Sequence, residues 1–347
     1  MNIIFKLVEK FICRMYKIDF DSLDEWIKEK SIKRVLIQVP LGLRPQIPLI
    51  AKYLKDRNVE AIISTGKCWG ACDIAYWEAE AIGADGIIHM GHARFVDYDE
   101  MPVFYIECRL ADPNPLLEMV DKVSEVIGEG KVVGIGVTIQ WVEFLDLFAE
   151  KLRERGIRIL AGKRGFKTPY RGQVVGCDYT CIWSVKDKID CSLIIGSRFH
   201  GIGASLTTSK PVYVIDPELK KIREVSSEVK ELLKCRYAWI EVFRNSRRIG
   251  VLIGVKPGQR KIHTAYRMKK ILEESGKEVD LLTVDELNAD QLDNLPYEGY
   301  VNTACPRLSI EDQMKFRTPL LLPSEALIAC GKFKWENTIY SSRYLIS

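Results

Sequence analysis

Short, almost wholly apolar runs alternate along the chain with longer segments in which apolar residues recur every three or four positions. Residues 34–39, 86–90 and 131–137 are runs of the first kind, which is typical of strands buried on both faces. Residues 47–58 and 142–155 show the second pattern, which predicts amphipathic helices. Strands that alternate with helices indicate βαβ crossovers and a mainly parallel sheet.

The pattern of elements also repeats within the chain. Residues 189–200 match 86–95 almost position for position, and KPVYVI at 210–215 matches MPVFYI at 101–106. In a third round, GYVNTACPR at 299–307 aligns with the start of the 86–95 segment without a gap. Such an internal repeat predicts the architecture more securely than residue propensities do.

We therefore expect an α/β fold of three similar βαβ-type modules with mainly parallel sheets, arranged around a pseudo-threefold central cleft. In such modules the loops at the carboxyl ends of the strands carry the site, so three modules can direct these loops at one cleft. The expected divisions are an N-terminal extension (1–19), module 1 (20–111), module 2 (112–217), a linker helix (218–239) and module 3 (240–347).

Composition and charge narrow the class of protein. The 347 residues are 47% hydrophobic and 28% charged, as in ordinary globular proteins, and are enough for more than one core. The 51 basic and 47 acidic residues give a net charge of +4, too weak an excess to predict direct nucleic-acid binding. Lys6, Glu9 and Lys10 interrupt the apolar N-terminal segment, which predicts neither a signal peptide nor a spanning helix. We expect a cytoplasmic protein with reduced thiols and no membrane partner.

Ten cysteines are too few for a disulfide scaffold, so in a reducing compartment they are candidates for metal or redox chemistry. Cys72, Cys177 and Cys305 each follow Gly or Ala and precede Asp or Pro, in loops predicted to follow strands. Soft thiolates select iron–sulfur clusters and zinc, and three of them can hold a 4Fe–4S cluster with one iron open to substrate. The third-round alignment puts Cys305 at the position of His92, so it follows a different strand of its module than the other two.

Two alternatives remain open for these thiols. Cys68 and Cys181 each stand four positions from a candidate, and four thiols with this C-x-x-x-C spacing can form a zinc site, although Cys305 is then unexplained. Alternatively, the cysteines are small buried hydrophobic residues, which is the simplest interpretation of the remaining five. Those five are Cys13, Cys108, Cys191, Cys235 and Cys330.

Histidine and arginine recur near the predicted strand ends. His89 alternates into an apolar strand and is interpreted as a core histidine, whereas His92 and His200 follow strand ends, where we expect exposure to the cleft. An arginine stands at the same place in each repeat and can either hold a carboxylate by a forked contact or fasten its own loop. These arginines are Arg94, Arg198 and Arg307. No dinucleotide fingerprint, P-loop or G-x-S-x-G motif stands at a suitable place, which disfavours hydride and phosphoryl transfer.

Five segments together are more specific than any cysteine pair. They are VPLGL at 39–43, GACD at 70–73, GADGIIHMGHA at 83–93, GCD at 176–178 and NTACPRLSI at 302–310. With them the chain resembles, over nearly its whole length, the archaeal form of the radical enzyme that starts diphthamide biosynthesis, 2-(3-amino-3-carboxypropyl)histidine synthase. The resemblance implies three related domains that each give one cysteine to a 4Fe–4S cluster, and those cysteines are Cys72, Cys177 and Cys305.

The resemblance further implies a radical transferase reaction. A reduced 4Fe–4S cluster would cleave S-adenosylmethionine to a 3-amino-3-carboxypropyl radical, which adds to carbon 2 of a histidine imidazole on translation elongation factor 2. The implied partners are this protein substrate, an electron donor and a second copy of the chain in a homodimer. The predicted S-adenosylmethionine contacts are His92, Arg94, Arg198, His200, Gln259 and Arg307.

The chain departs from the family pattern in three places. Cys68-Trp69 stands where the family has threonine and tyrosine, the loop 256–259 matches the family's glycine-rich segment only loosely, and residues 1–15 lie outside the resemblance. Two other functions fit the same cysteines. One is a quinolinate-synthase-like 4Fe–4S dehydratase, and the other is a zinc-stabilised, non-catalytic protein that binds a translation factor.

Overall fold

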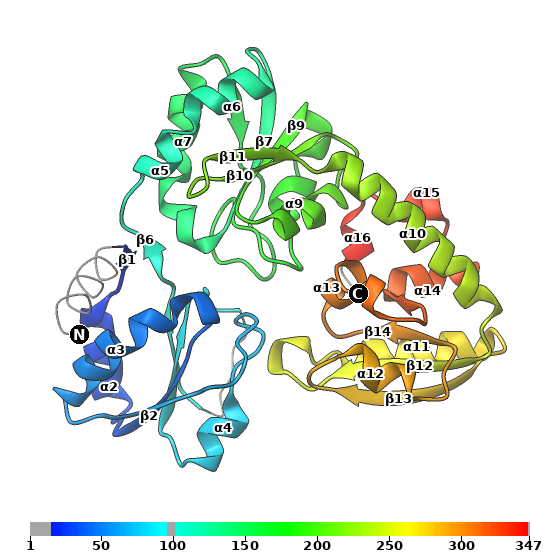
Figure 1. The fold of residues 1–347 in the computed structure, drawn as a ribbon, viewed down its shortest axis with the longest axis horizontal. Coiled ribbons are helices and arrows are strands. Elements are labelled where there is room, and N and C mark those ends of the chain that lie inside the picture. Colours follow the sequence, from blue (N-terminus) through cyan, green and yellow to red (C-terminus); the bar gives the residue numbers. More distant parts are fainter. Residues whose placement is uncertain (1–14, 96–100, 346–347) are drawn as a thin grey trace.

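The computed structural model describes residues 15–95 and 101–345, and three sheets of four or five strands dominate it (Figure 1). The first sheet consists of four parallel strands. In spatial order these are β3 (Glu60–Ile63), β2 (Arg34–Gln38), β4 (Gly86–Met90) and β5 (Val103–Ile106).

The other two sheets repeat this strand order. The second is β8 (Arg158–Leu160), β7 (Val132–Val137), β9 (Cys191–Ile195) and β10 (Val212–Asp216), with β11 (Lys221–Glu224) added antiparallel at the edge. The third is β13 (Glu278–Val284), β12 (Arg248–Gly254), β14 (Gly299–Asn302) and β15 (Leu320–Leu321), all parallel. In each sheet the first of these strands in chain order lies between the second and the third. The prediction of an α/β fold with mainly parallel sheets is confirmed.

The central strands are buried on both faces, as their apolar runs predict. Val35 and Ile37 of β2 belong to one hydrophobic core, whereas Leu36 between them belongs to another. In β12, Val251 and Leu252 likewise point into two different cores. Alternation along a strand sends successive side chains to opposite faces, so a continuous apolar run requires cover on both.

Helices flank the sheets (Figure 1). Around the first sheet lie α2 (Phe20–Glu29), η1 (Leu41–Gln46), α3 (Ile47–Lys55) and α4 (Tyr76–Ala81). Around the second lie α5 (Asn114–Leu117), α6 (Val120–Ile127), η2 (Ile139–Phe144), α7 (Leu145–Arg153), α8 (Thr180–Trp183), η3 (Lys186–Lys188) and α9 (Arg198–Ser205). The remaining helices are α10 (Ser226–Asn245), η4 (Pro257–Gln259), α11 (Ile262–Glu274), α12 (Ala289–Asp293), α13 (Pro306–Ile310), η5 (Gln313–Lys315), α14 (Pro323–Ala329), α15 (Trp335–Thr338) and α16 (Ser342–Leu345). Among the described residues no helix is both long and apolar enough to cross a membrane.

Three expectations about elements need correction. The predicted linker helix at 218–239 was wrong at its start, because 221–224 form strand β11, and the helix α10 runs on to Asn245. The expected extension at 1–19 is in part structural, since β1 (Tyr16–Lys17) pairs with β6 (Arg109–Leu110); residues 1–14 lie outside the described part. The segment after β9 is the helix α9 rather than a loop, and Ser197 and His200 cap its start.

A buried ion pair fastens the long helix α10 to the C-terminal part of the chain. The Arg236 guanidinium donates to Glu325 Oε1 at 2.8 Å, to Gln313 Oε1 at 2.8 Å and to the carbonyls of Ser309 and Leu320 at 2.9 Å. Arg236 and Glu325 are fully buried, so each needs the other to remain charged there. Helix α10 therefore joins the second sheet to the third (Figure 1).

Candidate metal centre

The three candidate cysteines lie in loops at the carboxyl ends of parallel strands. Cys72 lies between β3 and α4, Cys177 lies between β8 and α8, and Cys305 stands directly before α13. The strands β3 and β8 are the second of their sheets in chain order, whereas β14, which precedes Cys305, is the third. The prediction that Cys305 follows a different strand is confirmed.

The three thiols lie close enough to perturb one another. Burial raises the pKa of Cys72 to about 12; a hydrogen bond from Gln259 opposes this, and the neighbouring thiols of Cys305 and Cys177 add to it. Burial followed by the proximity of Cys177 also raises the pKa of Cys305. All three cysteines are half-buried and form no disulfide. The effects on pKa show that loops far apart in sequence meet at one site.

The spacing of this site suits a cluster better than a single ion. Cys72, Cys177 and Cys305 do not form a group of ligand atoms within 4.8 Å of one another, as one ion would require; in the described chain such a group is formed elsewhere. In an iron–sulfur cluster each thiolate binds a different iron, which allows wider spacing. The donor set of three soft thiols therefore fits the predicted 4Fe–4S cluster.

The four-thiol zinc alternative is not realised. Cys181 is 1% exposed and packs in a hydrophobic core with Val174, Tyr179 and Ile182. Cys68 lies apart from Cys181, beside two histidines. Among the described residues the thiols of the two C-x-x-x-C pairs thus do not gather at one point.

The 3-10 helix η4 approaches the Cys72 loop very closely. Gln259 Nε2 lies 3.4 Å from Cys72 Sγ, and the backbone N–H of Gly258 donates to the Cys72 carbonyl at 2.9 Å. A Cβ atom at Gly258 would lie 2.6 Å from Cys72 Cα. Only glycine permits this approach of two backbones. The loosely matching segment 256–259 therefore lies against the loop that carries Cys72.

An ion cluster beside Cys72 links the first and third sheets. Lys256 Nζ lies 2.8 Å from both Asp73 Oδ1 and Glu286 Oε1, and 3.3 Å from Asp285 Oδ1. Burial opposes the charge of Lys256, but hydrogen bonds to Asp73 and Glu286 outweigh it and raise its pKa. Glu286 Oε1 also accepts from Trp69 Nε1 at 2.9 Å. These contacts hold the Cys72 loop against the end of β13.

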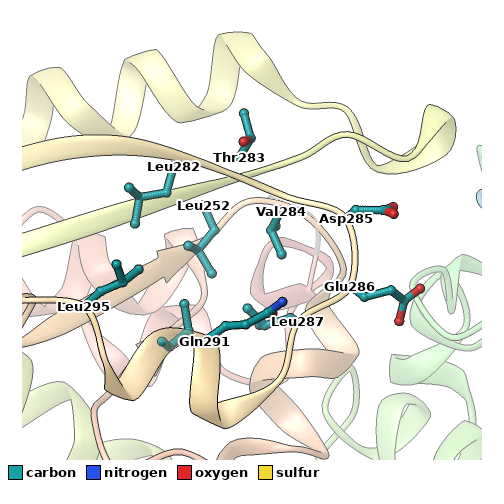
Figure 2. A pocket seen from close by; sticks show the side chains of 10 residues that line it. Leu252, Leu282, Thr283, Val284, Asp285, Glu286, Leu287, Gln291 and Leu295 are labelled. Carbon is teal, nitrogen blue, oxygen red and sulfur yellow. The ribbon is translucent and has the colours of Figure 1, made fainter.

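Glu286 also lies at the rim of a pocket of about 340 Å³, at the carboxyl ends of β12 and β13 (Figure 2). Five leucines and Val284 line it together with the polar side chains of Thr283, Asp285, Glu286 and Gln291. In the third sheet this loop takes the place that carries Cys72 and Cys177 in the other two. Asp285 and Glu286 therefore lie in the loop of the third sheet that is equivalent to the cysteine-bearing loops of the other two sheets.

Two lysines that the sequence did not single out accompany the thiols. Lys167 Nζ lies 3.5 Å from Cys177 Sγ and 5.2 Å from the centre of the Phe95 ring. Burial and then the charge of Lys167 lower the pKa of Lys261 to about 8, and Cys177 and Cys305 oppose this shift. No motif marks either lysine, because only the folded chain brings them to the thiols.

Of the predicted arginines and histidines, Arg307 lies beside the thiols and His200 lies near Arg307. Arg307 pairs with Glu311 at 2.7 Å, stacks 3.8 Å from the Phe199 ring centre and lies against Gly176, which precedes Cys177. The His200 ring packs against the same Phe199 ring, with 3.8 Å between the two ring centres. Burial and the nearby Arg307 charge lower the pKa of His200 to about 3.

The other three predicted contacts lie differently. Arg198 is exposed and forms an ion pair with Glu228 of α10. Arg94 is exposed just after β4. His92 Nδ1 lies 2.9 Å from Nε2 of His89, and its pKa is lowered to about 4 by burial. His89 is fully buried, as expected of a core histidine, although it is also part of a polar network.

Comparison with known proteins adds to this geometry. The family model described as diphthamide synthesis protein matches residues 39–341. The chain is similar to the 2-(3-amino-3-carboxypropyl)histidine synthase of Pyrococcus horikoshii, with 31% identity over 322 residues that cover 91% of each chain. It is also similar to subunit 1 of the Saccharomyces cerevisiae enzyme, with 27% identity over 327 residues, 92% of this chain and 75% of that one. The crystal structure of Dph2 from Pyrococcus horikoshii with a 4Fe–4S cluster matches with a TM-score of 0.81 at 29% identity, over 92% of both chains.

Proposed function

Because this chain belongs to the diphthamide synthesis protein family, we propose that it is a 2-(3-amino-3-carboxypropyl)histidine synthase, the enzyme of the first step of diphthamide biosynthesis. It is a transferase that uses a 4Fe–4S cluster and S-adenosylmethionine. The reduced cluster supplies the electron that cleaves S-adenosylmethionine to a 3-amino-3-carboxypropyl radical, which is transferred to carbon 2 of a histidine imidazole on elongation factor 2. The dehydratase and zinc-protein alternatives have no comparable support.

The observation that carries the proposal is the meeting of three thiols from three separate loops. Cys72, Cys177 and Cys305 are the proposed cluster ligands, supported by the effect of neighbouring thiols on the pKa of Cys72 and of Cys305 and by the fact that, among the described residues, their sulfurs do not group within 4.8 Å as around one ion. The lysines at 167 and 261 offset the negative charge that three thiolates and a cluster bring together.

Within the predicted set of S-adenosylmethionine contacts, Gln259 and Arg307 have the strongest case. Gln259 already reaches Cys72 Sγ, and Arg307 lies between Phe199 and the Gly176 backbone with a charged guanidinium that suits a carboxylate. His200 stacks beside Arg307. Less supports the other three, Arg94, Arg198 and His92. Arg198 pairs with Glu228 of α10, and His92 contacts His89.

The wider organisation follows from the same sheets. The proposed modules, 20–111, 112–217 and 240–347, are related by a pseudo-threefold axis, which the shared strand order of the three sheets supports. Elongation factor 2, an electron donor and a second copy of the chain are the proposed partners, and the proposed location is the cytoplasm. One chain supplies all three cysteines, so each subunit of a homodimer would hold a complete cluster.

The test is a reconstituted reaction under anaerobic conditions. Reduced protein, S-adenosylmethionine labelled in the aminocarboxypropyl group and elongation factor 2 are mixed, and methylthioadenosine and labelled factor are measured. We expect both products in the wild type. Cys72→Ser, Cys177→Ser and Cys305→Ser should each abolish both products together with iron binding. Cys235→Ser is the matched control, because this cysteine is exposed on α10. Formation of 5′-deoxyadenosine, or unlabelled factor with full iron content, would contradict the proposal.

A further inference from the structure

A second group of metal-ligating side chains lies beside the three-cysteine site and is not used by it. Cys68, His89 and His92 bring the cysteine sulfur and one nitrogen of each ring within 4.8 Å of one another. Cys68 lies in the loop after β3, His89 in β4 and His92 just after β4. His89 is fully buried and the other two residues are half-buried, so the group faces inward rather than toward bulk solvent.

The hydrogen bonds around His89 determine which of its nitrogens is free to bind. Gln38 Nε2 donates to the Asp73 carbonyl at 2.6 Å, and the Ala75 N–H donates to Gln38 Oε1 at 3.2 Å, which fixes the orientation of the amide. Gln38 Oε1 lies 2.9 Å from His89 Nδ1, so this nitrogen carries the proton and donates it. His89 Nε2 therefore presents a lone pair to His92 Nδ1 and Cys68. A ring nitrogen held by an outer acceptor is the usual arrangement of a metal-bound histidine.

We propose that Cys68, His89 and His92 bind one Zn²⁺ ion, with water as the fourth ligand. A thiolate and two neutral imidazoles suit zinc, with Zn–S of about 2.3 Å and Zn–N of about 2.0–2.1 Å. Binding releases the thiol proton of Cys68, and the proton by which His92 Nδ1 donates to His89 Nε2 in this structure moves to His92 Nε2. At a tetrahedral ion two nitrogens are about 3.3 Å apart. The present 2.9 Å separation thus requires His92 to move by a few tenths of an ångström.

The position of this ion would fasten the Cys72 loop to the first sheet. Cys68 stands four residues before Cys72, whereas His89 and His92 belong to the end of the central strand β4. A zinc ion would thus link the loop to the end of β4 through its coordination bonds. The Lys256 contact to Asp73 holds the same loop on the other side. The proposal does not depend on the reaction proposed above, since it concerns only these three residues.

The test measures zinc and iron separately in the same protein. Anaerobically prepared protein with its cluster is dialysed against chelator-buffered Zn²⁺, and both metals are counted per chain by mass spectrometry. We expect one zinc in addition to the iron in the wild type, and at least a 100-fold weaker zinc affinity in Cys68→Ala with the iron unchanged. Cys330→Ala is the matched control, since it removes a half-buried thiol remote from both histidines.

X-ray absorption at the zinc edge of the wild type provides a readout that needs no variant. The proposal predicts one sulfur, two imidazole nitrogens and one water oxygen around zinc. A spectrum with three sulfurs, which would place zinc on the cluster cysteines, would overturn it, as would the absence of stoichiometric zinc or equal zinc binding by Cys68→Ala. Iron content and methylthioadenosine formation in the same samples report on the proposed reaction, so failure of one proposal is distinguishable from failure of the other.

Discussion

The loops after β3 and β8 occupy the same place in two sheets of equal strand order, and each presents a cysteine to the candidate site. They are stabilised in opposite ways. In the loop after β8, Asp178 accepts hydrogen bonds from the Lys167 N–H at 3.0 Å, the Thr180 N–H at 3.0 Å and the Thr180 hydroxyl at 2.7 Å. All three donors belong to the loop or to the helix that follows it. The turn around Asp178 is thus held by nearby residues.

The loop after β3 is ordered by distant residues. Gln38 of β2 holds the Asp73 carbonyl, Lys256 pairs with the Asp73 carboxylate, and Gly258 donates to the Cys72 carbonyl. Two of these three contacts come from the third sheet, about 180 residues away in sequence. The difference teaches that the hydrogen bonds around Asp178, next to Cys177, are local, whereas the position of Cys72 depends on how the first and third sheets dock.

The largest effect on this comparison should come from Asp178→Ala. The substitution removes three hydrogen bonds to a buried carboxylate, and bonds to charged groups contribute about 1.5–3 kcal/mol each. Because the three are coupled within one loop, we expect a loss of about 3 kcal/mol in the free energy of unfolding, measured with urea. The counterpart Asp73→Ala should cost less, since Lys256 keeps Glu286 as a partner. Equal losses would contradict the distinction between the loops.

Gly258→Ala tests whether the docking of the third sheet against the Cys72 loop is needed for the reaction. The added methyl group would lie 2.6 Å from the Cys72 backbone, so η4 or the Cys72 loop must move away. We expect about a 30-fold fall in methylthioadenosine formation, equivalent to ~2 kcal/mol, together with a lower iron content. Gly42→Ala is the matched control, because a Cβ at Gly42 meets nothing within 4 Å. Full activity in Gly258→Ala would show that the close approach is unnecessary.

The charges near the two thiols differ, and Lys167→Met tests this difference. Lys167 places a cation 3.5 Å from Cys177, whereas the side chain that donates a hydrogen bond to Cys72 Sγ, at 3.4 Å, is the neutral amide of Gln259. Removing the cation destabilises the reduced, more negative cluster. We expect the reduction potential to fall by about 60 mV, equivalent to ~1.4 kcal/mol for one electron, and to fall less in Gln259→Leu. A potentiometric titration followed by electron paramagnetic resonance measures both, with the exposed Lys163→Met of the same loop as the control.

The smallest expected effect is a pH dependence carried by His200, on the side of the second sheet. Its pKa is about 3 in the folded chain, through burial and the charge of Arg307, and about 6.5 in an unfolded chain. The unfolded state therefore takes up the proton first, and the stability contribution is complete above pH 6.5 and is lost as the pH falls toward 3. Between pH 6.5 and 5.5 we expect a loss of about 1 kcal/mol. In His200→Gln the urea midpoint should vary less with pH over this interval; an unchanged slope would argue against the assignment.

Much of the fold was predictable because the repeat constrains it. The apolar runs at 34–39, 86–90 and 131–137 are strands almost to the residue, since only a strand buried on both faces needs such a run. The helix α9 was missed because the RFHGIGAS segment is rich in glycine and has no amphipathic pattern. Strand β11 was missed because KIRE is polar, and its pairing with β10 supplies the order that its composition does not.

Some residues of the candidate site could likewise be predicted from the sequence, and others could not. Cys72, Cys177 and Cys305 could be chosen from the sequence, because each stands between a predicted strand and a turn residue and the repeat relates their loops. Lys167, Lys261 and Gly258 could not, because lysines and glycines are common and no spacing marks these three. The grouping of Cys68 with His89 and His92 was also out of reach, since it depends on how the loop after β3 folds back over the end of β4.

The sequence by itself thus determined the parallel α/β architecture, the repeat and the three cysteines, because hydrophobic periodicity and turn residues act locally. Only the tertiary structure decided that the thiols share one site, that Cys181 is buried in a core, and that Lys256 and Gly258 hold the Cys72 loop. The physical reason is the separation in sequence over which each kind of interaction acts. Periodicity specifies which face of an element is buried, whereas the docking of one sheet against another depends on contacts between residues nearly 200 positions apart.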